Sequence, residues 1–271
     1  MHDLNATGLK RATLITDLSC LGKCSLSVGL PILSAYGAEA VALPTAVLST
    51  HTDGFGEYTL RDMTEDMKAI IMQWKRLKLR FDCIYTGFFA SLEQLSVAEE
   101  FIHDFGGEGC LVIVDPILGD NGALYSCFSP AHVDAMRRLC RAADIITPNR
   151  TEAQLLTGLG EGCGADALLS ALETPNAIVT GVRRGDEIGY AARLDGGYHE
   201  LFRPYLNAVL HGTGDVFTSA LCGELLRGAP LPAAFVAAAD FCDRCIAATA
   251  PRLASHWYGL AFEEVLASRG K

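Results

Sequence analysis

The pentapeptide His211-Gly212-Thr213-Gly214-Asp215 is the segment whose residue types are best suited to chemistry. It runs directly into the apolar stretch 216–226, which has the length and composition of a helix. Glycines let a phosphate approach the main chain, and the free N–H groups and dipole of a helix N-terminus favour negative charge. Asp215, in the first turn, can take a proton from an alcohol. The segment predicts a phosphoryl-transfer site or, read alone, an ordinary capped helix.

Composition limits the partners of such a site. The chain has 271 residues, 50% of them apolar, and a formal net charge of −10. This is enough apolar material for a sizeable core, and the negative charge argues against binding to nucleic acid or to an anionic membrane. A phosphate ligand must then be held by local dipoles, metal ions and a few cations such as Lys23, Arg183 or Arg184.

Two further features bear on location and redox chemistry. Residues 1–17 contain no apolar targeting core, and no stretch approaches the length of a membrane span, so a cytoplasmic protein is expected. The ten cysteines are scattered, and Cys242 and Cys245 form a single C-x-x-C in an alanine-rich helical stretch. A structural zinc site needs four such ligands at defined spacing, so we expect core thiols instead.

The elements that must position the pentapeptide alternate between short apolar runs and longer amphipathic ones. This alternation is typical of βαβ units and predicts an α/β fold with a mostly parallel sheet. A two-stranded hairpin should follow, turning at Asp195-Gly196-Gly197, and no linker interrupts the chain, so one domain over 1–271 is expected. The expected strands are 12–16, 38–43, 83–86, 111–114, 144–147, 176–180, 188–193 and 198–203, with helices at 67–77, 92–104, 131–141 and 216–226.

Polar residues follow the expected parallel strands at the point where each strand ends. Ligands of open parallel sheets bind at the carboxyl ends of the strands, so these side chains are expected to converge on one site. The polar residues are Asp17, Thr45, Ser49, His51, Thr52, Asp115, Asn149, Glu152 and Thr180, and Gly87, Phe88 and Gly181 lie at the same strand ends.

Four segments, in this order and spacing, resemble the pyridoxal kinase branch of the ribokinase-like superfamily. They are Leu48-Ser49-Thr50-His51-Thr52, the stretch 115–122 (DPILGDNG), the stretch 144–153 (DIITPNRTEA) and the pentapeptide at 211–215. The resemblance covers nearly the whole chain. It implies a three-layer α/β/α fold with helices on both faces of the sheet, and ATP-dependent phosphorylation of the 5'-hydroxymethyl group of B6 vitamers.

The resemblance also implies roles for individual residues. Asp215 matches the catalytic base, and Gly212, Thr213 and Gly214 match an anion hole. The nucleotide is implied to contact Asp115, Asn149, Thr180, Gly181, Gly212 and Gly214, with Phe235–Ala239 near the adenine. Mg²⁺ is implied at Asp115 and Glu152, with a monovalent cation such as K⁺ as a further cofactor. The capping-box spacing of Asn149 and Glu152 offers a structural role that can coexist with metal support.

For the vitamin, the resemblance points to Asp17, Thr45, His51, Thr52 and Phe88, with 120–126 as a flexible cover and a homodimer as the expected assembly. A flat ring needs an apolar wall and a few directional hydrogen bonds. Many relatives carry Ser at the position of Asp17 and Tyr at that of Phe88. An aspartate there can pair with a protonated ring nitrogen or an amine, which favours pyridoxamine or pyridoxine over pyridoxal.

Three alternatives remain at this point. Hydroxymethylpyrimidine/phosphomethylpyrimidine kinases share the fold but usually carry Cys where this chain has Asp215, and they open with a glycine-rich segment that is missing after Asp17. Sugar kinases carry a Gly-Gly segment near the N-terminus that is absent here. A non-catalytic B6-binding protein would not need a proton acceptor together with metal support.

Overall fold

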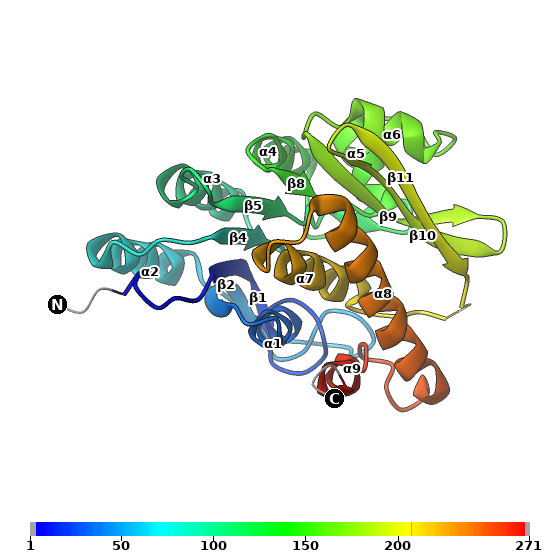
Figure 1. The fold of residues 1–271 in the computed structure, drawn as a ribbon, viewed down its shortest axis with the longest axis horizontal. Helices are drawn as coiled ribbons and strands as arrows, with labels where there is room; N and C mark the ends of the chain where they lie inside the picture. The colour runs from blue at the N-terminus through cyan, green and yellow to red at the C-terminus, as the bar shows by residue number, and fades with distance from the viewer. Residues whose placement is uncertain (1–3, 207, 269–271) are drawn as a thin grey trace.

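The computed structural model describes residues 4–206 and 208–268 and is built on a nine-stranded sheet (Figure 1). The strand order is β11-β10-β9-β8-β5-β4-β1-β2-β3, and a separate ribbon pairs β6 with β7. The strands are β1 (Arg11–Ser19), β2 (Glu39–Leu48), β3 (Leu60–Asp62), β4 (Cys83–Thr86), β5 (Leu111–Val114), β6 (Gly119–Asp120), β7 (Ala123–Leu124), β8 (Ile145–Ile146), β9 (Asn176–Arg184), β10 (Glu187–Leu194) and β11 (Gly197–Pro204).

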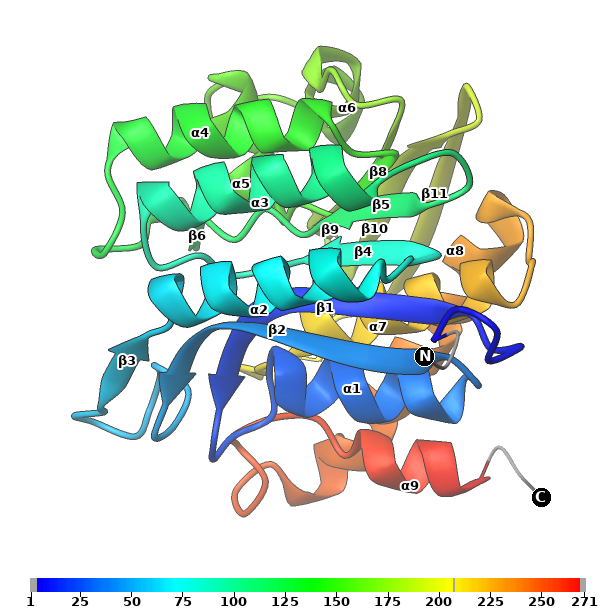
Figure 2. The ribbon, with the colours of Figure 1, turned by 90° about the vertical axis from the view of Figure 1, so that its left-hand side faces the viewer.

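The six central strands, from β9 to β2, pair in parallel, and antiparallel strands close both edges. All eight strands expected from the sequence are present, which confirms the mostly parallel α/β fold. The short strand β3 and the β6–β7 ribbon were not expected. Figure 2 shows β3 and β6 at the same edge of the molecule, where the parallel strands end.

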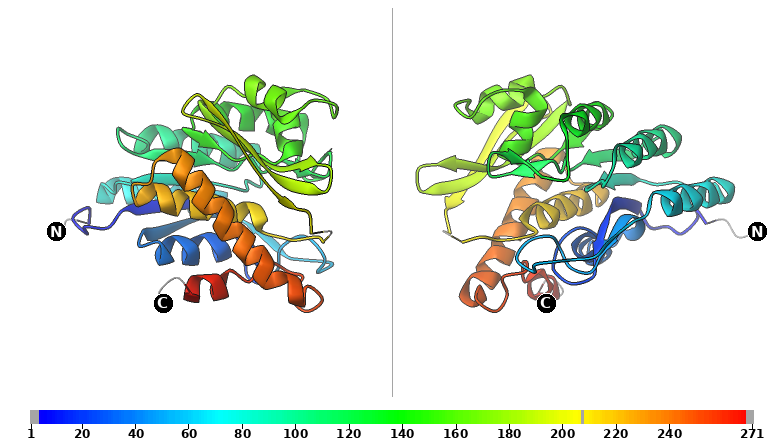
Figure 3. Two further views of the ribbon diagram at one scale, coloured as in Figure 1. Left: turned by 45° about the vertical axis from the view of Figure 1, so that its right-hand side comes forward. Right: turned by 180° about the vertical axis from the view of Figure 1, so that it is seen from behind.

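Helices cover both faces of the sheet, as a three-layer fold requires. One face carries α2 to α6, whose apolar sides pack on Ile15, Leu43 and Ile84. The other carries α1, α7, α8 and α9, which pack on Leu14, Tyr85 and Ile113 (Figure 3). The helices are α1 (Leu26–Ala35), α2 (Thr64–Leu77), α3 (Leu92–Phe105), α4 (Pro130–Arg141), α5 (Arg150–Thr157), α6 (Ala165–Ala171), α7 (Thr213–Leu226), α8 (Leu231–Thr249), a 3₁₀ turn at Ala250–Arg252 and α9 (Phe262–Ser268).

The pairing of β1 with β2 contains a bulge beside the predicted substrate residues. Thr16 pairs with Pro44 and Leu18 pairs with Val47, so one β1 residue between these pairs, Asp17, lies opposite two β2 residues. The irregularity falls on Asp17 and Thr45. A bulge twists the strand and re-aims side chains, and here it occurs where both strands approach the carboxyl edge of the sheet.

The β10–β11 hairpin turns on two residues. Leu194 pairs with Gly197, so only Asp195 and Gly196 form the turn, with φ values of 50° and 78°. Two consecutive positive φ values define the type I′ turn that matches the twist of a hairpin. Gly197, expected in the turn, is instead the first residue of β11.

Five of the ten cysteines are buried and two, Cys20 and Cys127, are exposed, so the expectation of core thiols holds for half of them. Cys242 and Cys245 are fully buried on α8, and no group of potential metal ligands occurs in the described part of the chain. In the same residues, no helix is both long and apolar enough to cross a membrane.

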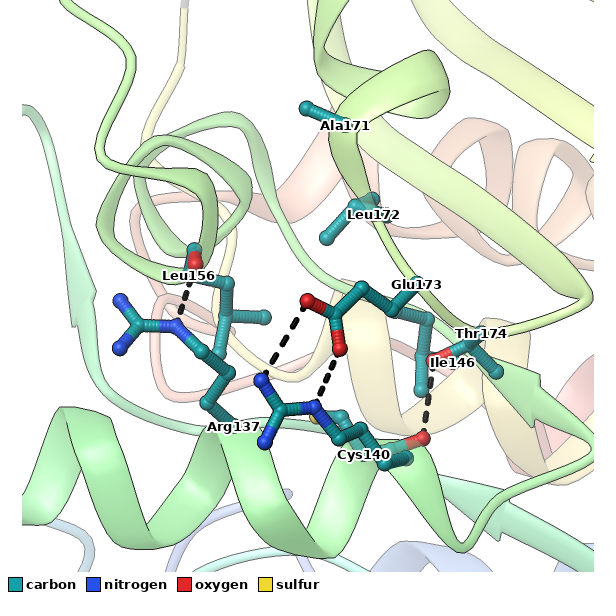
Figure 4. A pocket seen from close by; sticks show the side chains of 9 residues that line it. Arg137, Cys140, Ile146, Leu156, Ala171, Leu172, Glu173 and Thr174 are labelled. Atoms are coloured by element: carbon teal, nitrogen blue, oxygen red, sulfur yellow. Dashed lines mark hydrogen bonds and ion pairs between the residues drawn. The ribbon is translucent and has the colours of Figure 1, made fainter.

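A small cavity of about 30 Å³ lies between α4, α5 and the segment before β9 (Figure 4). Arg137 donates to the carbonyl of Leu156 at the end of α5, and Thr174 donates to that of Cys140 at the end of α4. Such a space holds about one water molecule. Because it lies where β8 and β9 begin, it belongs to the edge of the sheet opposite the predicted site.

Candidate active site

The turn before α7 forms the base of the site. Gly212 is the N-cap of α7, with φ 75° and ψ 13°, and a Cβ there would lie 2.2 Å from the carbonyl oxygen of Lys23. Only glycine satisfies both the backbone angle and this close approach. The first intrahelical bond joins the Val216 N–H to the Gly212 carbonyl at 3.0 Å. The amides of Thr213, Gly214 and Asp215 precede it, which is the arrangement of an anion-binding helix N-terminus.

Asp215 lies in the first turn of α7 among groups that disfavour its charge. Burial raises the pKa of Asp215 to about 7, the charge of Asp17 adds to this, and the Ser25 backbone N–H opposes it. A carboxyl whose pKa lies near neutrality is half-ionised at neutral pH and is well matched to accepting a proton.

Asp17, at the end of β1, is almost fully buried. The Ser25 hydroxyl donates to its Oδ1 at 2.5 Å, and the Ser19 hydroxyl donates to its Oδ2 at 3.1 Å. Burial nevertheless raises the pKa of Asp17, because desolvation outweighs these hydrogen bonds. Cys24 lies beside the same acids, and burial with the charges of Asp215 and Asp17 raises its pKa to about 12.

Asp115, at the end of β5, faces the same turn. Its Oδ2 would lie 3.8 Å from a Cβ on Gly214, and it is 4% exposed. Burial, followed by the charges of Glu152 and Asp215, raises the pKa of Asp115, while a hydrogen bond with Thr147 opposes the shift. Burial likewise raises the pKa of Glu152 to about 8. Electrostatic interactions thus link Asp17 to Asp215, and Asp115 to both Asp215 and Glu152.

The capping box expected at Asn149 and Glu152 is present. The Asn149 side chain accepts from the Glu152 N–H, and the Glu152 carboxylate accepts from the Asn149 N–H at 2.7 Å and the Leu118 N–H at 3.2 Å. Both Glu152 oxygens therefore hold backbone. The Asn149 amide donates to the carbonyl of Gly119, and an isolated parallel bridge pairs Asn149 with Thr180.

The stretch expected to cover the site begins as the β6–β7 ribbon. Its turn residues, Asn121 and Gly122, have φ values of 52° and 80°. The Gly122 N–H donates to the Thr151 hydroxyl at 2.9 Å, which ties the ribbon to the first turn of α5. The ribbon therefore rises from the segment that Asn149 and Glu152 hold in place.

The other predicted vitamin contacts lie at the ends of β2 and β4. The Thr45 hydroxyl donates to the carbonyl of Phe88 at 2.8 Å, and the Phe88 N–H donates to the Thr16 hydroxyl at 3.0 Å. The half-buried Phe88 ring lies 5.8 Å from that of Phe128, beyond the ribbon. Thr52 is exposed on the loop after β2.

His51 is buried in that loop. Its Nδ1 accepts from the Asp53 N–H at 3.2 Å, so the proton of the neutral ring lies on Nε2. Nε2 faces the Tyr258 backbone but has no hydrogen bond of normal geometry within the described residues. Burial, together with the nearby His211, lowers the pKa of His51. The ring is therefore neutral at pH 7, with a buried donor available.

Sequence reasoning missed an aromatic cluster around His51. Its ring centroid lies 4.8 Å from Phe55, 5.0 Å from His211 and 6.2 Å from Trp257. A Cβ on Gly54 would lie 2.5 Å from the Trp257 ring, and the Lys23 N–H donates to the Tyr258 carbonyl. The segment after α8 thus braces the loop after β2 and the segment before α1. The aromatic pair Trp257-Tyr258 was the available signal.

The cations considered as phosphate ligands are engaged elsewhere. Lys23 pairs with Glu263 at 2.6 Å and lies over the Phe262 ring. Arg184 pairs with Glu187 and Glu200, and Arg183 lies over the Tyr205 ring at 3.4 Å. The expected adenine wall at 235–239 is only partly open to a ligand, because Val236 is 49% exposed and three of the five residues are buried.

Phe235, Ala238 and Ala239 are at most 1% exposed and pack in the core beside Phe217. Their apolar character reflects packing of α8 on α7.

The fold and site together define a kinase of the ribokinase-like superfamily: a parallel sheet whose carboxyl edge holds a glycine turn, an adjacent aspartate and further buried acids. The chain belongs to the phosphomethylpyrimidine kinase family, whose model matches residues 30–258.

Solved structures agree with this assignment. A Bacteroides thetaiotaomicron protein provisionally assigned as a phosphomethylpyrimidine kinase is 37% identical, with a TM-score of 0.94 over 99% of this chain and 96% of that one. A second crystal form of it contains pyridoxal and is 36% identical, with a TM-score of 0.90 over 97% and 96% of the two chains. The pyridoxal kinase from Lactobacillus plantarum is 33% identical, with a TM-score of 0.88 over 96% of each chain.

A curated relative comes from the sibling activity. The hydroxymethylpyrimidine/phosphomethylpyrimidine kinase of Haemophilus influenzae is 25% identical over 89% of this chain and 92% of its own length.

Proposed function

We propose that residues 1–271 form one kinase domain that transfers the γ-phosphoryl group of ATP to the 5'-hydroxymethyl group of B6 vitamers. The observation that carries the proposal is the position of Asp215. Asp215 is half-buried in the first turn of α7, directly after the glycine turn, and its pKa is raised to about 7. The similarity to a protein solved with pyridoxal supports the choice of substrate class.

In this proposal Asp215 accepts the proton of the substrate hydroxyl. The amides of Gly212, Thr213 and Gly214 stabilise the negative charge that develops on the transferring phosphoryl group. Phosphoryl transfer passes through a loose transition state, so positioning and charge stabilisation supply most of the acceleration. Because a glycine is required at 212 by the nearby Lys23 carbonyl, the turn is rigidly placed beside α1.

Asp115, Asn149, Thr180, Gly181 and the glycines of the turn are proposed to contact the nucleotide. Mg²⁺ fits this site, because Asp115 and Glu152 are buried and offer carboxylate oxygens, the kind of ligand that this ion prefers. Asp115 would hold Mg²⁺ directly, and Glu152 would support it while holding the backbone. When bound, the ion would neutralise phosphate charge. A monovalent cation such as K⁺ is proposed only from the resemblance.

The vitamin ring is proposed to lie between the ends of β1, β2 and β4. Phe88, held by Thr45 and Thr16, offers an apolar wall. His51 offers the Nε2 donor, and Thr52 lies on the same loop. Asp17 would meet the ring nitrogen or an amine, either as an acid that donates or as a carboxylate that accepts.

The test is a vitamer panel. The purified protein is assayed with Mg-ATP and, separately, with pyridoxal, pyridoxamine, pyridoxine and hydroxymethylpyrimidine, and kcat/KM is measured for each. We expect the B6 vitamers to exceed hydroxymethylpyrimidine by at least about tenfold, which corresponds to about 1.4 kcal/mol of transition-state binding. Turnover of hydroxymethylpyrimidine alone would replace the proposal by the sibling activity.

Hydroxymethylpyrimidine phosphorylation is the second candidate, since the family model and the Haemophilus influenzae relative both favour it. A non-catalytic B6-binding protein is the third, and binding of a vitamer without ATP turnover would establish it.

A homodimer in the cytoplasm is also proposed. Sedimentation at several protein concentrations tests the oligomeric state.

A further inference from the structure

Gln94, in the first turn of α3, has a side chain that is completely buried. Its backbone N–H donates to the hydroxyl of Ser91, the N-cap of α3, at 3.3 Å. At this spacing a capping box would have the Gln94 side chain accept from the N–H of the N-cap residue itself. The side-chain oxygen accepts instead from the Ala90 N–H, one residue earlier, at 2.8 Å. The Gln94 amide therefore holds the segment that follows β4.

The nitrogen of the same amide points to β2. It donates to the Thr45 carbonyl at 2.8 Å, and the Thr64 hydroxyl and the Asp62 carboxylate lie at 3.1 Å and 3.2 Å from it. The chemistry of the partners fixes the orientation of the amide, because the Ala90 N–H requires an acceptor and the Thr45 carbonyl requires a donor. One buried side chain thus joins the end of β2 to the segment after β4.

The two segments that Gln94 joins also hold the backbone of Phe88. The Thr45 hydroxyl donates to the Phe88 carbonyl at 2.8 Å, and the Phe88 N–H donates to the Thr16 hydroxyl at 3.0 Å. Thr45 is held in turn through its carbonyl, which accepts from Gln94 and from the Met63 N–H at 3.0 Å. Loss of the Gln94 amide would therefore reach Phe88 both through Thr45 and along the chain.

We propose that Gln94 is a positioning residue for the vitamin ring: its amide holds Thr45 and the segment 88–90 together, and so sets where the Phe88 ring lies relative to the end of β2. Gln94 itself does not touch the substrate, because it is completely buried. A flat ring is bound by an apolar wall and a few directed hydrogen bonds, so a displaced wall weakens binding. This inference rests on the proposed function, in which Phe88 forms that wall.

Gln94→Met tests the proposal, because it removes both hydrogen-bonding groups and nearly keeps the volume of the side chain. We expect the KM for the preferred B6 vitamer to rise about tenfold, with kcat and the KM for Mg-ATP within about threefold of the wild type. A purely structural defect would reduce the amount of folded enzyme, which lowers the apparent kcat without raising KM. An unchanged KM for the vitamer would overturn the proposal.

Gln94→Glu breaks the link to β2 alone. Its carboxylate keeps an oxygen for the Ala90 N–H but, at about pH 8.5, sets a second oxygen instead of a donor against the Thr45 carbonyl. We expect a rise of about tenfold in the KM for the vitamer here as well. This variant also provides the measurement if Gln94→Met does not fold. A wild-type KM in Gln94→Glu would overturn the proposal, since the bond to Thr45 would then be dispensable.

Thr174→Val is the matched control. Thr174 is 2% exposed and donates to the Cys140 carbonyl at 2.8 Å, at the opposite edge of the sheet. Like Gln94→Met, this substitution removes a buried hydrogen bond to the main chain, so the midpoint of urea denaturation should fall. We expect the KM for the vitamer to stay within about twofold of the wild type. An equal rise of this KM in Thr174→Val and Gln94→Met would overturn the proposal.

Crystal structures of the wild type and of Gln94→Met give a readout that does not depend on turnover. In the variant we expect the bond between the Thr45 hydroxyl and the Phe88 carbonyl to be lost and the Phe88 ring to move away from the end of β2. An unmoved Phe88 would refute the positioning role. A wild-type enzyme that is inactive on the vitamer panel would instead refute the proposed function, and the crystal structures would still decide whether Gln94 positions Phe88.

Discussion

Asn149 and Glu152 bind each other through two reciprocal hydrogen bonds at the start of α5, with N···O distances of 2.9 Å and 2.7 Å. The second oxygen of Glu152 accepts from the Leu118 N–H, directly before the β6–β7 ribbon. The Glu152 carboxylate thus fixes the start of α5, which faces the proposed nucleotide site. It also fixes the base of the β6–β7 ribbon.

Glu152→Gln should therefore destabilise the protein. In the wild type, each carboxylate oxygen of Glu152 accepts a hydrogen bond from a backbone N–H. In the variant, an NH2 group would replace one of these oxygens, so that a buried N–H would lose its acceptor. Such a loss costs about 1–3 kcal/mol in the free energy of unfolding. Urea denaturation measures this, with the exposed Glu108→Gln as a control. We also expect a higher KM for Mg-ATP. Unchanged stability would show that Glu152 does not hold this backbone.

Asp215→Asn tests the proposed base. The amide keeps the shape of the side chain but cannot accept the proton, so kcat should fall by a factor of about 10² or more. Binding of ATP, measured by calorimetry, should be nearly unchanged. Asp66→Asn on the exposed face of α2 serves as a control. Near-normal turnover in Asp215→Asn would remove Asp215 from this role.

The same carboxyl should make stability depend on pH. The pKa of Asp215 rises from 3.8 to about 7 on folding, so between about pH 4 and pH 7 the folded state keeps a proton that the unfolded state releases. The free energy of unfolding should then fall as pH rises, by at most about 1.4 kcal/mol per pH unit for this proton.

His51, whose pKa is lowered, contributes with the opposite sign. Urea titrations of the wild type and of Asp215→Asn at several pH values isolate the contribution of the Asp215 carboxyl to the pH dependence of stability. The contribution of His51 is present in both proteins and cancels in their difference. We expect the difference in unfolding free energy between them to change across this window. A constant difference would contradict the raised pKa.

Gly54→Ala tests the aromatic cluster. A methyl group there would lie 2.5 Å from the Trp257 ring and should displace it, which loosens the loop that carries His51. We expect a higher KM for the vitamer, little change in KM for ATP, and altered Trp257 fluorescence in a Trp74→Phe background. Gly56→Ala is a matched control, because Gly56 has φ 78° but no atom within 4 Å of its Cβ position. Equal effects of both variants would indicate backbone strain alone.

Cys24 should react slowly with alkylating reagents. The thiolate is the nucleophile, and burial beside Asp215 and Asp17 raises the pKa of Cys24 to about 12. Mass spectrometry after brief treatment with iodoacetamide near neutral pH should find the exposed Cys20 labelled well before Cys24. Faster labelling of Cys24 would show that the acids do not suppress its ionisation.

The eight strands and the mostly parallel sheet were predictable from the sequence, because apolar periodicity reports burial, whereas the three layers were implied by the resemblance and the strand order was not predicted. The carboxyl-edge rule also brought Asp17, Asp115 and Asn149 to one edge, since parallel strands end together. The positive φ of Ser25 was not predictable, because its hydroxyl binds Asp17 from another element of the fold. Lys23 appeared to be a phosphate ligand because its partner, Glu263, lies 240 residues away in the chain.

Helix α8 shows the same limit. Apolar residues at Phe235, Ala238 and Ala239 are compatible with a ligand wall or with packing against a neighbouring helix, and composition does not distinguish the two. Packing on α7 accounts for these three residues, whereas Val236 between them is 49% exposed. Trp257 lies beyond the four segments that carry the resemblance, so nothing local connected it with His51.

The extra residue of β2 opposite Asp17 restricts how this part of the chain can vary in length. Deleting one residue at 45–46 would remove the bulge and keep Val47 opposite Leu18, but it would change how the side chains of Asp17 and Thr45 are directed into the site. Gains and losses of residues among relatives should therefore be rare in this strand and more common in exposed turns such as 106–109.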